Sequence, residues 1–384
     1  MELKKRLKKI IGWLHLWLGL AAGIVIITVA LTGSLLSFED ELENILFKHR
    51  HIVAVQGQRL SADSLVRIAN SVFAGKNVNR MLIDAEPDHS VEARIGGKGK
   101  ALKVAYINPY TGAVLFKGDY SAQFFQQVRN LHRYLLLADT GKVITGISCA
   151  ICFFMVISGV IIWWPANKNA IKQRFKIKWD AKGKRLNWDL HAVTGFYLSI
   201  FLLVSTTTGL VWSYTPVENL LYKIASSKPE KDAKVKNISK QKTIDTGVYE
   251  LMFKQTNQLY NYEGNVAFAF PAKAGQSVMM QKEKENSTTR QTDQAWFDGK
   301  TAKLISQIPF DKMNAGTKLR RMILPIHTGS LFGWPTKLLA CLVGLITASM
   351  PVTGMLIWWG KKKKPKKKKV EATPVCINKR EKEL

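Results

Sequence analysis

Four apolar segments constrain the fold of this chain more than any other feature of the sequence. They are residues 10–36, 143–164, 192–212 and 338–359, each 21 to 27 residues long and free of Lys, Arg, Asp and Glu. A helix needs roughly 20 apolar residues to cross the hydrocarbon core of a bilayer. The sequence therefore predicts a membrane α-helical protein with four transmembrane helices, and its near-zero mean hydropathy is an average over helices and polar segments.

The distribution of positive charge predicts how these helices are oriented. Residues 1–14, 165–188 and 360–384 hold 24 of the 57 basic residues but only 5 of the 28 acidic ones. Short loops rich in Lys and Arg are retained in the cytoplasm. We therefore expect both termini to be cytoplasmic and the segments 37–142 and 213–337 to lie on the opposite side of the membrane.

The net charge of +29 lies largely beside the apolar segments. Basic residues in that position attract anionic lipid headgroups, so membrane lipid is the expected partner of this charge and nucleic acid is not. The first apolar segment is longer than the apolar region of a signal peptide, and no A-x-A cleavage site follows it. It is expected to remain in the protein as an anchor.

The expected division of the chain follows from these spans and charges. It comprises a cytoplasmic N-terminus and first helix (1–36), a first external module with an interfacial helix (37–142), a second helix (143–164), a basic cytoplasmic loop (165–190), a third helix (191–212), a second external module with an interfacial helix (213–337), a fourth helix (338–359) and a basic cytoplasmic tail (360–384).

The two halves of the chain repeat one spacing of histidine, glycine and tryptophan. Each half has an even number of helices, so both enter the membrane from the same side, and we expect two parallel repeats about a pseudo-two-fold axis along the membrane normal. The first repeated spacing is 18 residues, from His15 to Gly33 and from His191 to Gly209. The second is 27 residues, from His132 to Gly159 and from His327 to Gly354. The third is 31 residues, from His132 to Trp163 and from His327 to Trp358.

The external segments contain similar patterns of strand, turn and strand. Residues 105–116 read AYINPYTGAVLF, in which Asn108 and Gly112 supply turn geometry between apolar strand formers, and residues 295–306 read AWFDGKTAKLIS. Residues 61–73 begin with a serine and have helical apolar spacing. The simplest expectation is a small α+β module that is present twice.

The histidines are the candidate functional residues. Symmetry-related residues lie at one depth, so His15 should pair with His191 near the cytoplasmic face and His132 with His327 near the external face. Ionisable groups at such depths are costly and usually functional. Two neutral imidazoles can ligate haem iron axially. Because no CxxCH motif occurs, we expect two non-covalent b haems with these four histidines as ligands.

Haem propionates need cationic partners, and basic residues lie near both histidine pairs. The candidates at the external pair are Arg129, Arg133, Arg320 and Arg321, and those at the cytoplasmic pair are Lys8, Lys9 and Arg185.

Several other residues have simpler explanations. The repeated glycines, each preceded by Thr or Ser, suit the close approach of a helix or a haem, and helix packing is the preferred interpretation. The cysteines of the CAIC sequence, Cys149 and Cys152, are expected to pack between helices. Trp163, Trp164, Trp358 and Trp359 are interpreted as anchors at the inner membrane interface. His49, His51 and His89 have no repeat partner and could bind a metal or replace an external ligand.

At HLWLGL (15–20), NPYTG (108–112), HAVTG (191–195) and HTGSLFGWPTK (327–337), the chain resembles the PepSY-associated transmembrane helix family. This family includes bacterial iron-regulated inner-membrane proteins and ferric-siderophore reductases. The resemblance implies two PepSY-like periplasmic modules, two b haems held by the four paired histidines, and delivery of electrons to a ferric siderophore. FDGKT in place of NPYTG and the lysine-rich tail depart from the family pattern, and the former puts the fold of the second module in doubt.

The expected function is therefore electron transfer across the membrane to Fe(III). Reduction to Fe(II) favours release of the iron, because the hard oxygen ligands of a siderophore suit Fe(II) poorly. No dinucleotide-binding motif is present, so a quinol or a cytoplasmic flavoprotein is the expected donor. Two alternatives stay open. One is a haem-free PepSY regulator of a peptidase or peptide, and the other is a siderophore or metal transporter, although the spans lack an acidic residue for coupling.

Overall fold

The computed structural model describes residues 2–97, 100–165, 171–229, 235–239, 246–271, 275–285 and 287–362. Nearly all of the basic tail predicted at 360–384, and residues 166–170 of the predicted basic loop, lie outside these residues.

Among the described residues, four helices are long and apolar enough to cross a membrane. They cover the four apolar segments expected from the sequence except for Trp164, the last residue of the second segment, and each begins four to eight residues earlier than its segment. The four are α1 (Glu2–Leu36), α6 (Ala138–Trp163), α8 (Lys184–Ser213) and α12 (Trp334–Lys362).

The four long helices form a ring in which α1 packs against α6 and α12, and α8 packs against the same two neighbours. Helices α1 and α8, the first of each half, therefore lie across the bundle from one another. Small residues allow close approach: a Cβ atom on Gly23 of α1 would lie 3.2 Å from Cβ of Pro351 on α12.

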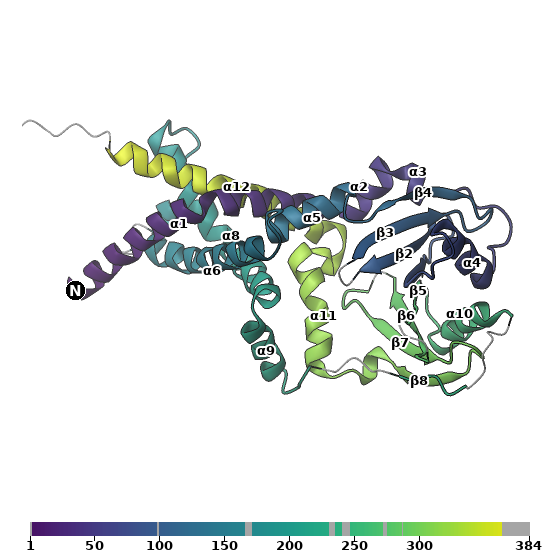
Figure 1. Ribbon diagram of the computed structural model, residues 1–384. Helices are drawn as coiled ribbons and strands as arrows, with labels where there is room; N and C mark the ends of the chain where they lie inside the picture. Colours follow the sequence, from purple (N-terminus) through teal and green to yellow (C-terminus); the bar gives the residue numbers. More distant parts are fainter. Residues whose placement is uncertain are drawn as a thin grey trace, which may run out of the picture.

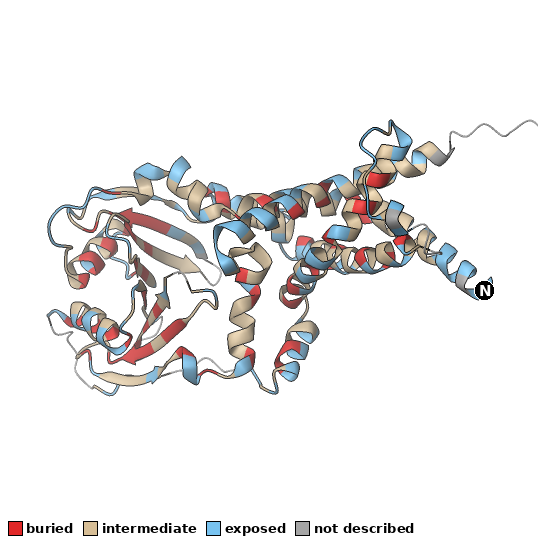
Figure 2. Ribbon diagram, turned by 180° about the vertical axis from the view of Figure 1, so that it is seen from behind, coloured by how far each residue is buried: buried red, intermediate tan, exposed pale blue. Residues whose placement is uncertain are grey.

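The outer surface of this bundle is apolar. Figure 2 shows that the long helices are mostly of intermediate burial or exposed, whereas buried residues concentrate in the sheet. Ile24 of α1 is 80% exposed, Ile200 of α8 60% and Leu345 of α12 47%. An apolar surface of this extent is unfavourable in water but matches the hydrocarbon chains of a bilayer.

A single antiparallel sheet of eight strands lies at one end of the bundle (Figure 1). Its order is β4-β3-β2-β1-β5-β6-β7-β8, so each half of the chain contributes four consecutive strands. The strands are β1 (Arg80–Ile83), β2 (Val91–Gly97), β3 (Lys100–Ile107), β4 (Val114–Asp119), β5 (Gly264–Ala269), β6 (Val278–Lys284), β7 (Thr292–Phe297) and β8 (Leu304–Ile308).

The two sets of strands join through β1 and β5, where Met81 is opposite Phe268. The sequence pattern indicated two modules but contained no sign that they share one sheet. Pairing satisfies the backbone groups of two strands that would otherwise be open edges. The outcome is one continuous sheet with a common core.

Helices α4 (Ala62–Val72) and α10 (Val248–Leu259) cover one face of this sheet (Figure 1). Leu65 of α4 and Met252 of α10 are fully buried against it. The helix predicted at 61–73 is confirmed, and its capping residue is Ser61, whose Oγ accepts a hydrogen bond from the Ser64 N–H at 3.2 Å.

The two predicted turns use the same hydrogen bonds despite their different sequences. In NPYTG, Asn108 Oδ1 accepts from the N–H groups of Tyr110 (2.8 Å) and Thr111 (3.2 Å). In FDGKT, Asp298 Oδ1 accepts from Lys300 (3.1 Å) and Thr301 (3.3 Å). An aspartate can replace an asparagine here because both side chains accept bonds from backbone N–H groups two residues on. The departure from NPYTG therefore leaves the turn intact.

Shorter helices connect the bundle to the sheet. Two of them carry external histidines: α5 (Phe124–Tyr134) carries His132, and α11 (Ala315–Thr328) carries His327. The remaining elements are α2 (Glu39–Leu46), α3 (Lys48–His51), α7 (Ile171–Arg174), α9 (Thr215–Ile224), η2 (Phe310–Lys312) and η3 (Ser330–Phe332).

Candidate functional site

The structure brings the four repeated histidines together as two pairs. His15 on α1 faces His191 on α8, with ring centres 6.4 Å apart. His132 on α5 faces His327 on α11, with ring centres 6.2 Å apart. In each pair, one histidine comes from each half of the chain. These are the two pairings that the repeated spacing predicts.

Each ring is held at one nitrogen by a hydroxyl group from another helix. His15 Nδ1 lies 2.8 Å from Ser158 Oγ, and His132 Nδ1 lies 3.1 Å from Thr32 Oγ1. The second half repeats the arrangement. There, His191 Nδ1 is 2.9 Å from Thr353 Oγ1 and His327 Nδ1 is 2.8 Å from Thr208 Oγ1.

The hydroxyl groups also identify the protonated nitrogen of each ring. Ser158 donates its hydrogen to the Met155 carbonyl (3.1 Å), and Thr208 donates to the Val204 carbonyl (2.8 Å). Thr32 and Thr353 donate to carbonyls of their own helices in the same way. A hydroxyl that gives its hydrogen to a carbonyl accepts from the ring, so this network assigns the ring proton to Nδ1. Nε2 then keeps a lone pair for a metal.

His132 supports this assignment independently. Its Nδ1 also lies 3.0 Å from the carbonyl oxygen of Val29, which can only accept a hydrogen bond. The Nδ1–H tautomer is therefore required at this ring. A histidine that ligates a metal generally donates its other N–H to an oxygen in this manner, which orients the ring and raises its basicity.

The glycine that follows the hydroxyl residue makes room for the ring at three of the four histidines. A Cβ atom on Gly33 would lie 3.0 Å from Cε1 of His132, and one on Gly159 would lie 3.3 Å from Cε1 of His15. Gly354 has the same relation to His191, at 3.3 Å. The repeated Ser/Thr-Gly dipeptides thus contact the histidines, a role beyond the helix packing expected from the sequence.

The ring separation can be compared with that of two imidazoles that share one metal. A ring atom lies about 1.1 Å from the imidazole centre, given bond lengths of about 1.33 Å, and a metal–imidazole bond is about 2.0 Å long. Two axial imidazoles therefore have centres about 6.2 Å apart. The observed separations of 6.4 and 6.2 Å fit this value, so the residues present fit a metal centre with two axial histidines.

Burial keeps the external rings neutral. Removal from solvent lowers the pKa of His132 to about 4, with a further contribution from Arg133. Removal from solvent, followed by the repulsion of His132, lowers the pKa of His327 to about 4 as well. At neutral pH both imidazoles are therefore uncharged, as ligation of a metal requires.

The two pairs lie near opposite ends of the bundle. His15 and Thr32, the partner of His132, are both on α1 and are separated by 17 residues. At 1.5 Å per residue this is about 25 Å along the helix axis. The two pairs are thus separated by a distance close to the thickness of a hydrocarbon core, about 30 Å.

Two of the four external arginines form ion pairs with glutamates. Arg129 binds Glu39 at 2.5 Å, and Arg320 binds Glu218 at 2.6 Å. The guanidinium of Arg321 donates to the Thr292 carbonyl at 3.2 Å. Arg133 is exposed beside His132, and its guanidinium lies 5.1 Å from the centre of the Tyr134 ring. Their role towards propionates stays a prediction.

The cytoplasmic candidates lie at the ends of the long helices. Lys8 Nζ donates to the Trp164 carbonyl at 2.9 Å, whereas Lys9 is exposed. Arg185 Nε donates to Asp189 Oδ2 at 3.0 Å. The Asp189 side chain is fully buried two residues before His191, so Arg185 compensates a carboxylate next to the cytoplasmic pair.

The three histidines without a repeat partner lie outside the four long helices, in the part of the protein that contains the sheet. His51 packs against the Tyr106 ring, His89 Nδ1 is 2.9 Å from an Asp88 carboxylate oxygen, and His49 accepts a hydrogen bond from Arg50. Within the described ranges, no three His, Cys, Asp or Glu side chains are grouped as metal ligands. A metal site at these positions stays a prediction.

One interpretation from the sequence is wrong. Trp163 was expected to be an interfacial anchor, but it is only 4% exposed and its ring stacks on Phe196 at 3.8 Å between centres. Close packing of α6 on α8 buries it. Trp164 and Trp359, at 62% and 52% exposed, have the exposure of an anchor. Cys149, Cys152 and Cys341 are free thiols.

Sequence reasoning missed the hydroxyl residues that bind the rings. Thr32, Ser158, Thr208 and Thr353 each stand directly before a repeated glycine. Their repetition in step with the histidines was the available signal, but Ser and Thr in apolar helices also recur at packing positions.

Comparison with known protein families gives one match. The family model of the PepSY-associated TM region matches residues 12–361. This stretch includes all four paired histidines and their hydroxyl partners. A comparison with curated proteins found no match to the chain.

Proposed function

The chain belongs to the family of the PepSY-associated TM region, and from this premise we propose that it is a di-haem b membrane protein that transfers electrons to a ferric siderophore. One observation carries the proposal. Each pair of histidines has the separation of two axial ligands and presents Nε2 as the free nitrogen of each ring. When bound, haem b supplies reversible one-electron chemistry at its iron.

Residues of the chain would perform three tasks around each haem. His15 and His191 would hold one haem, and His132 and His327 would hold the other. The hydroxyl groups of the Ser/Thr-Gly dipeptides fix the Nδ1–H tautomer and aim Nε2. The glycines leave space for the ring edges. The protein thereby holds the ligands before any cofactor binds, which favours binding because less freedom is lost.

The arrangement of the helices supports the proposed symmetry. Helices α1 and α8 lie across the bundle from one another. Each half of the chain also contributes one histidine to each pair, two of the four hydroxyl contacts and four of the eight strands. We propose a pseudo-two-fold axis along the membrane normal. The basic segments then put both termini in the cytoplasm and the sheet in the periplasm of a bacterial inner membrane.

The external pair is the proposed site of electron delivery to the substrate. It lies on α5 and α11, which connect the bundle to the sheet (Figure 1). The exposed Arg133 beside His132 is a proposed partner for a propionate. The substrate gains one electron, Fe(III) becomes Fe(II), and the oxygen ligands of the siderophore then hold the metal less tightly. A quinol or a cytoplasmic flavoprotein is the proposed donor.

A single-turnover experiment tests this function. The purified protein is reduced with dithionite, freed of excess reductant under anaerobic conditions, and mixed with a ferric hydroxamate siderophore in the presence of an Fe(II)-specific chelating dye. The proposal expects the reduced absorption spectrum to return to the oxidised one while the Fe(II) dye complex forms in proportion.

The matched control is the Ga(III) complex of the same siderophore, which has the same charge and nearly the same size but cannot be reduced. It should leave the reduced spectrum unchanged. A colourless protein from haem-replete cells, or equal reoxidation by the ferric and gallium complexes, contradicts the proposal and leaves a regulator or a transporter in its place.

A further inference from the structure

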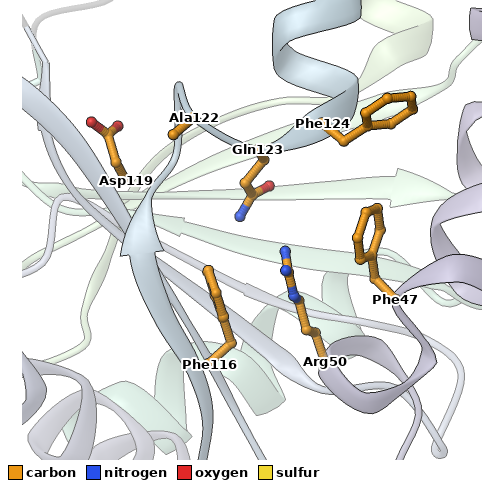
Figure 3. A pocket seen from close by; sticks show the side chains of 7 residues that line it. All are labelled: Phe47, Arg50, Phe116, Asp119, Ala122, Gln123 and Phe124. Atoms are coloured by element: carbon orange, nitrogen blue, oxygen red, sulfur yellow. The ribbon is translucent and has the colours of Figure 1, made fainter.

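A pocket of about 200 Å³ lies at the edge of the sheet, between α3, β4 and the start of α5. Figure 3 shows its side chains: the rings of Phe47 and Phe116 flank Arg50, and the amide of Gln123 faces the guanidinium group of Arg50. The ring of Phe124 forms a further wall. The pocket therefore combines apolar walls with two polar groups that face each other.

Arg50 is a fixed cation with no acidic partner among the described residues. Its guanidinium carbon lies 4.0 Å from the centre of the Phe116 ring and 4.5 Å from that of Phe47, so the two rings hold the group in place. Its Nε donates to His49 Nε2 at 3.3 Å. No Asp or Glu oxygen of the described chain comes within 4.0 Å of it. The terminal nitrogens face the pocket.

Gln123 contributes a buried donor that has no partner among the described residues. The residue is only 8% exposed, and within that part of the chain its buried Nε2 atom makes no hydrogen bond. Its Oε1 accepts a bond from the Tyr106 hydroxyl at 3.4 Å, which leaves the amide nitrogen towards Arg50. A buried donor without a hydrogen bond is destabilising. Two donors that face each other therefore favour an acceptor between them.

The backbone adds positive potential at the same place. Gln123 is the N-cap of α5, and its side chain makes no capping hydrogen bond. The N–H groups of the first turn of a helix point outward and carry partial positive charge, which favours an anion. The helix end, the guanidinium group and the amide nitrogen thus favour the same kind of ligand.

We infer that this pocket binds a carboxylate group carried on a flat apolar body, such as an aromatic monocarboxylate. The planar fork of an arginine matches the two oxygens of a carboxylate, and the Gln123 amide supplies another donor. The phenyl rings of Phe47, Phe116 and Phe124 would enclose the apolar part of the ligand.

The charge balance of the pocket favours a monoanion over a dianion. Arg50 is its single cationic side chain, and Asp119 also lines it. The Asp119 carboxylate is turned towards its own loop, where it accepts bonds from the Ser121 hydroxyl (2.7 Å) and N–H (2.9 Å). Arg50 can balance one negative charge on a ligand, whereas the negative charge of Asp119 repels a second one.

This site is separate from the histidine pairs. Phe124, at the pocket, and His132 lie at opposite ends of α5, eight residues or about 12 Å apart along the helix. The pocket therefore uses none of the paired histidines, and binding to it can be measured on the protein as purified.

Fluorine NMR of two matched probes tests the inference. The probes are 4-fluorobenzoate and the neutral 4-fluorobenzamide, which have nearly the same shape. Added to the purified full-length protein in detergent, the benzoate signal should broaden in a saturable manner and the benzamide signal should not. Arg50→Gln should weaken benzoate binding at least about tenfold, since a charge-assisted bond contributes about 1.5–3 kcal/mol.

Two further variants keep the test decisive if Arg50→Gln unfolds. Gln123→Glu adds a negative charge to the pocket and should abolish benzoate binding, whereas Arg67→Gln, an exposed arginine on α4, should leave it unchanged. The inference is overturned if benzoate and benzamide bind alike, if neither binds, or if folded Gln123→Glu protein binds benzoate as the wild type does.

Discussion

Thr32 and His132 are 100 residues apart in the chain, yet Thr32 Oγ1 lies 3.1 Å from His132 Nδ1. The threonine hydroxyl donates its own hydrogen to the Thr28 carbonyl at 2.7 Å, so it can only accept from the ring. The same relation holds for the three other paired histidines. A hydroxyl that fixes the tautomer of each ring is therefore a repeated element of the site.

Replacing this hydroxyl tests its role directly. Thr32→Val keeps the shape of the side chain but removes one of the two acceptors of His132 Nδ1, the other being the Val29 carbonyl. It should therefore weaken haem binding at this pair by about tenfold, the lower end of the effect of such partners. The remaining external haem should have a raised reduction potential, because a less basic imidazole donates less charge to the iron. Spectroelectrochemical titration measures both effects.

The controls for this prediction lie on the same helix. Thr32→Ser restores a hydroxyl group and should restore both the haem content and the reduction potential of the haem. Thr28→Val removes a hydroxyl that bonds only to the Ile24 carbonyl and should change neither. Equal potentials in Thr32→Val and wild-type protein would show that the hydroxyl does not act on the ligand.

The glycine beside the ring gives a second prediction. A methyl group on Gly33 would lie 3.0 Å from His132 Cε1, which is closer than van der Waals contact. Gly33→Ala should therefore displace the ring and weaken haem binding at the external pair about tenfold, as overpacking costs about 1–3 kcal/mol. Haem titration of the apoprotein measures this. Gly12→Ala on the same helix, with nothing within 4 Å, should bind haem as the wild type does.

The histidine pairs could be predicted from the sequence because their spacing repeats across two similar halves. The partners of their Nδ1 atoms could not, since a contact such as that between Thr32 and His132 joins residues that no local pattern connects. The continuity of the sheet was missed for the same reason, because Met81 and Phe268 pair across two connected modules. The FDGKT turn was recognised in shape but not in detail, because Asp298 and Asn108 are chemically different residues with one hydrogen-bonding role.

An acidic residue of the external part predicts a dependence of stability on pH. Burial, and then repulsion by Glu39 and Asp40, raise the pKa of Glu43 from 4.5 to about 7. Between these values the folded protein binds a proton that the unfolded chain has released, so stability falls as pH rises through this range. Above pH 7 the loss of folding stability caused by ionised Glu43 has reached its full value.

Glu43→Gln removes this cost and should raise the melting temperature at pH 8 more than at pH 5, by about 2–4 °C for each kcal/mol recovered. The pKa of His51 is lowered to about 4 by its burial and by Arg50, which lowers stability in acid in both proteins. Thermal unfolding at several pH values measures the difference. Glu86→Gln, at an exposed position, should show no such dependence, and a Glu43→Gln effect that is equal at pH 5 and pH 8 refutes the assignment.

The central claim is that each pair of histidines, one from each half of the chain, holds one haem. The most direct measurement is the haem content per chain, determined as the pyridine haemochrome, in the wild type, in His132→Ala, in His327→Ala and in the protein with both substitutions. The account predicts two b haems in the wild type and one in each single variant. It also predicts one in the double variant, because both residues serve the same iron. A wild-type protein without haem, or a double variant that loses the second haem as well, would contradict it.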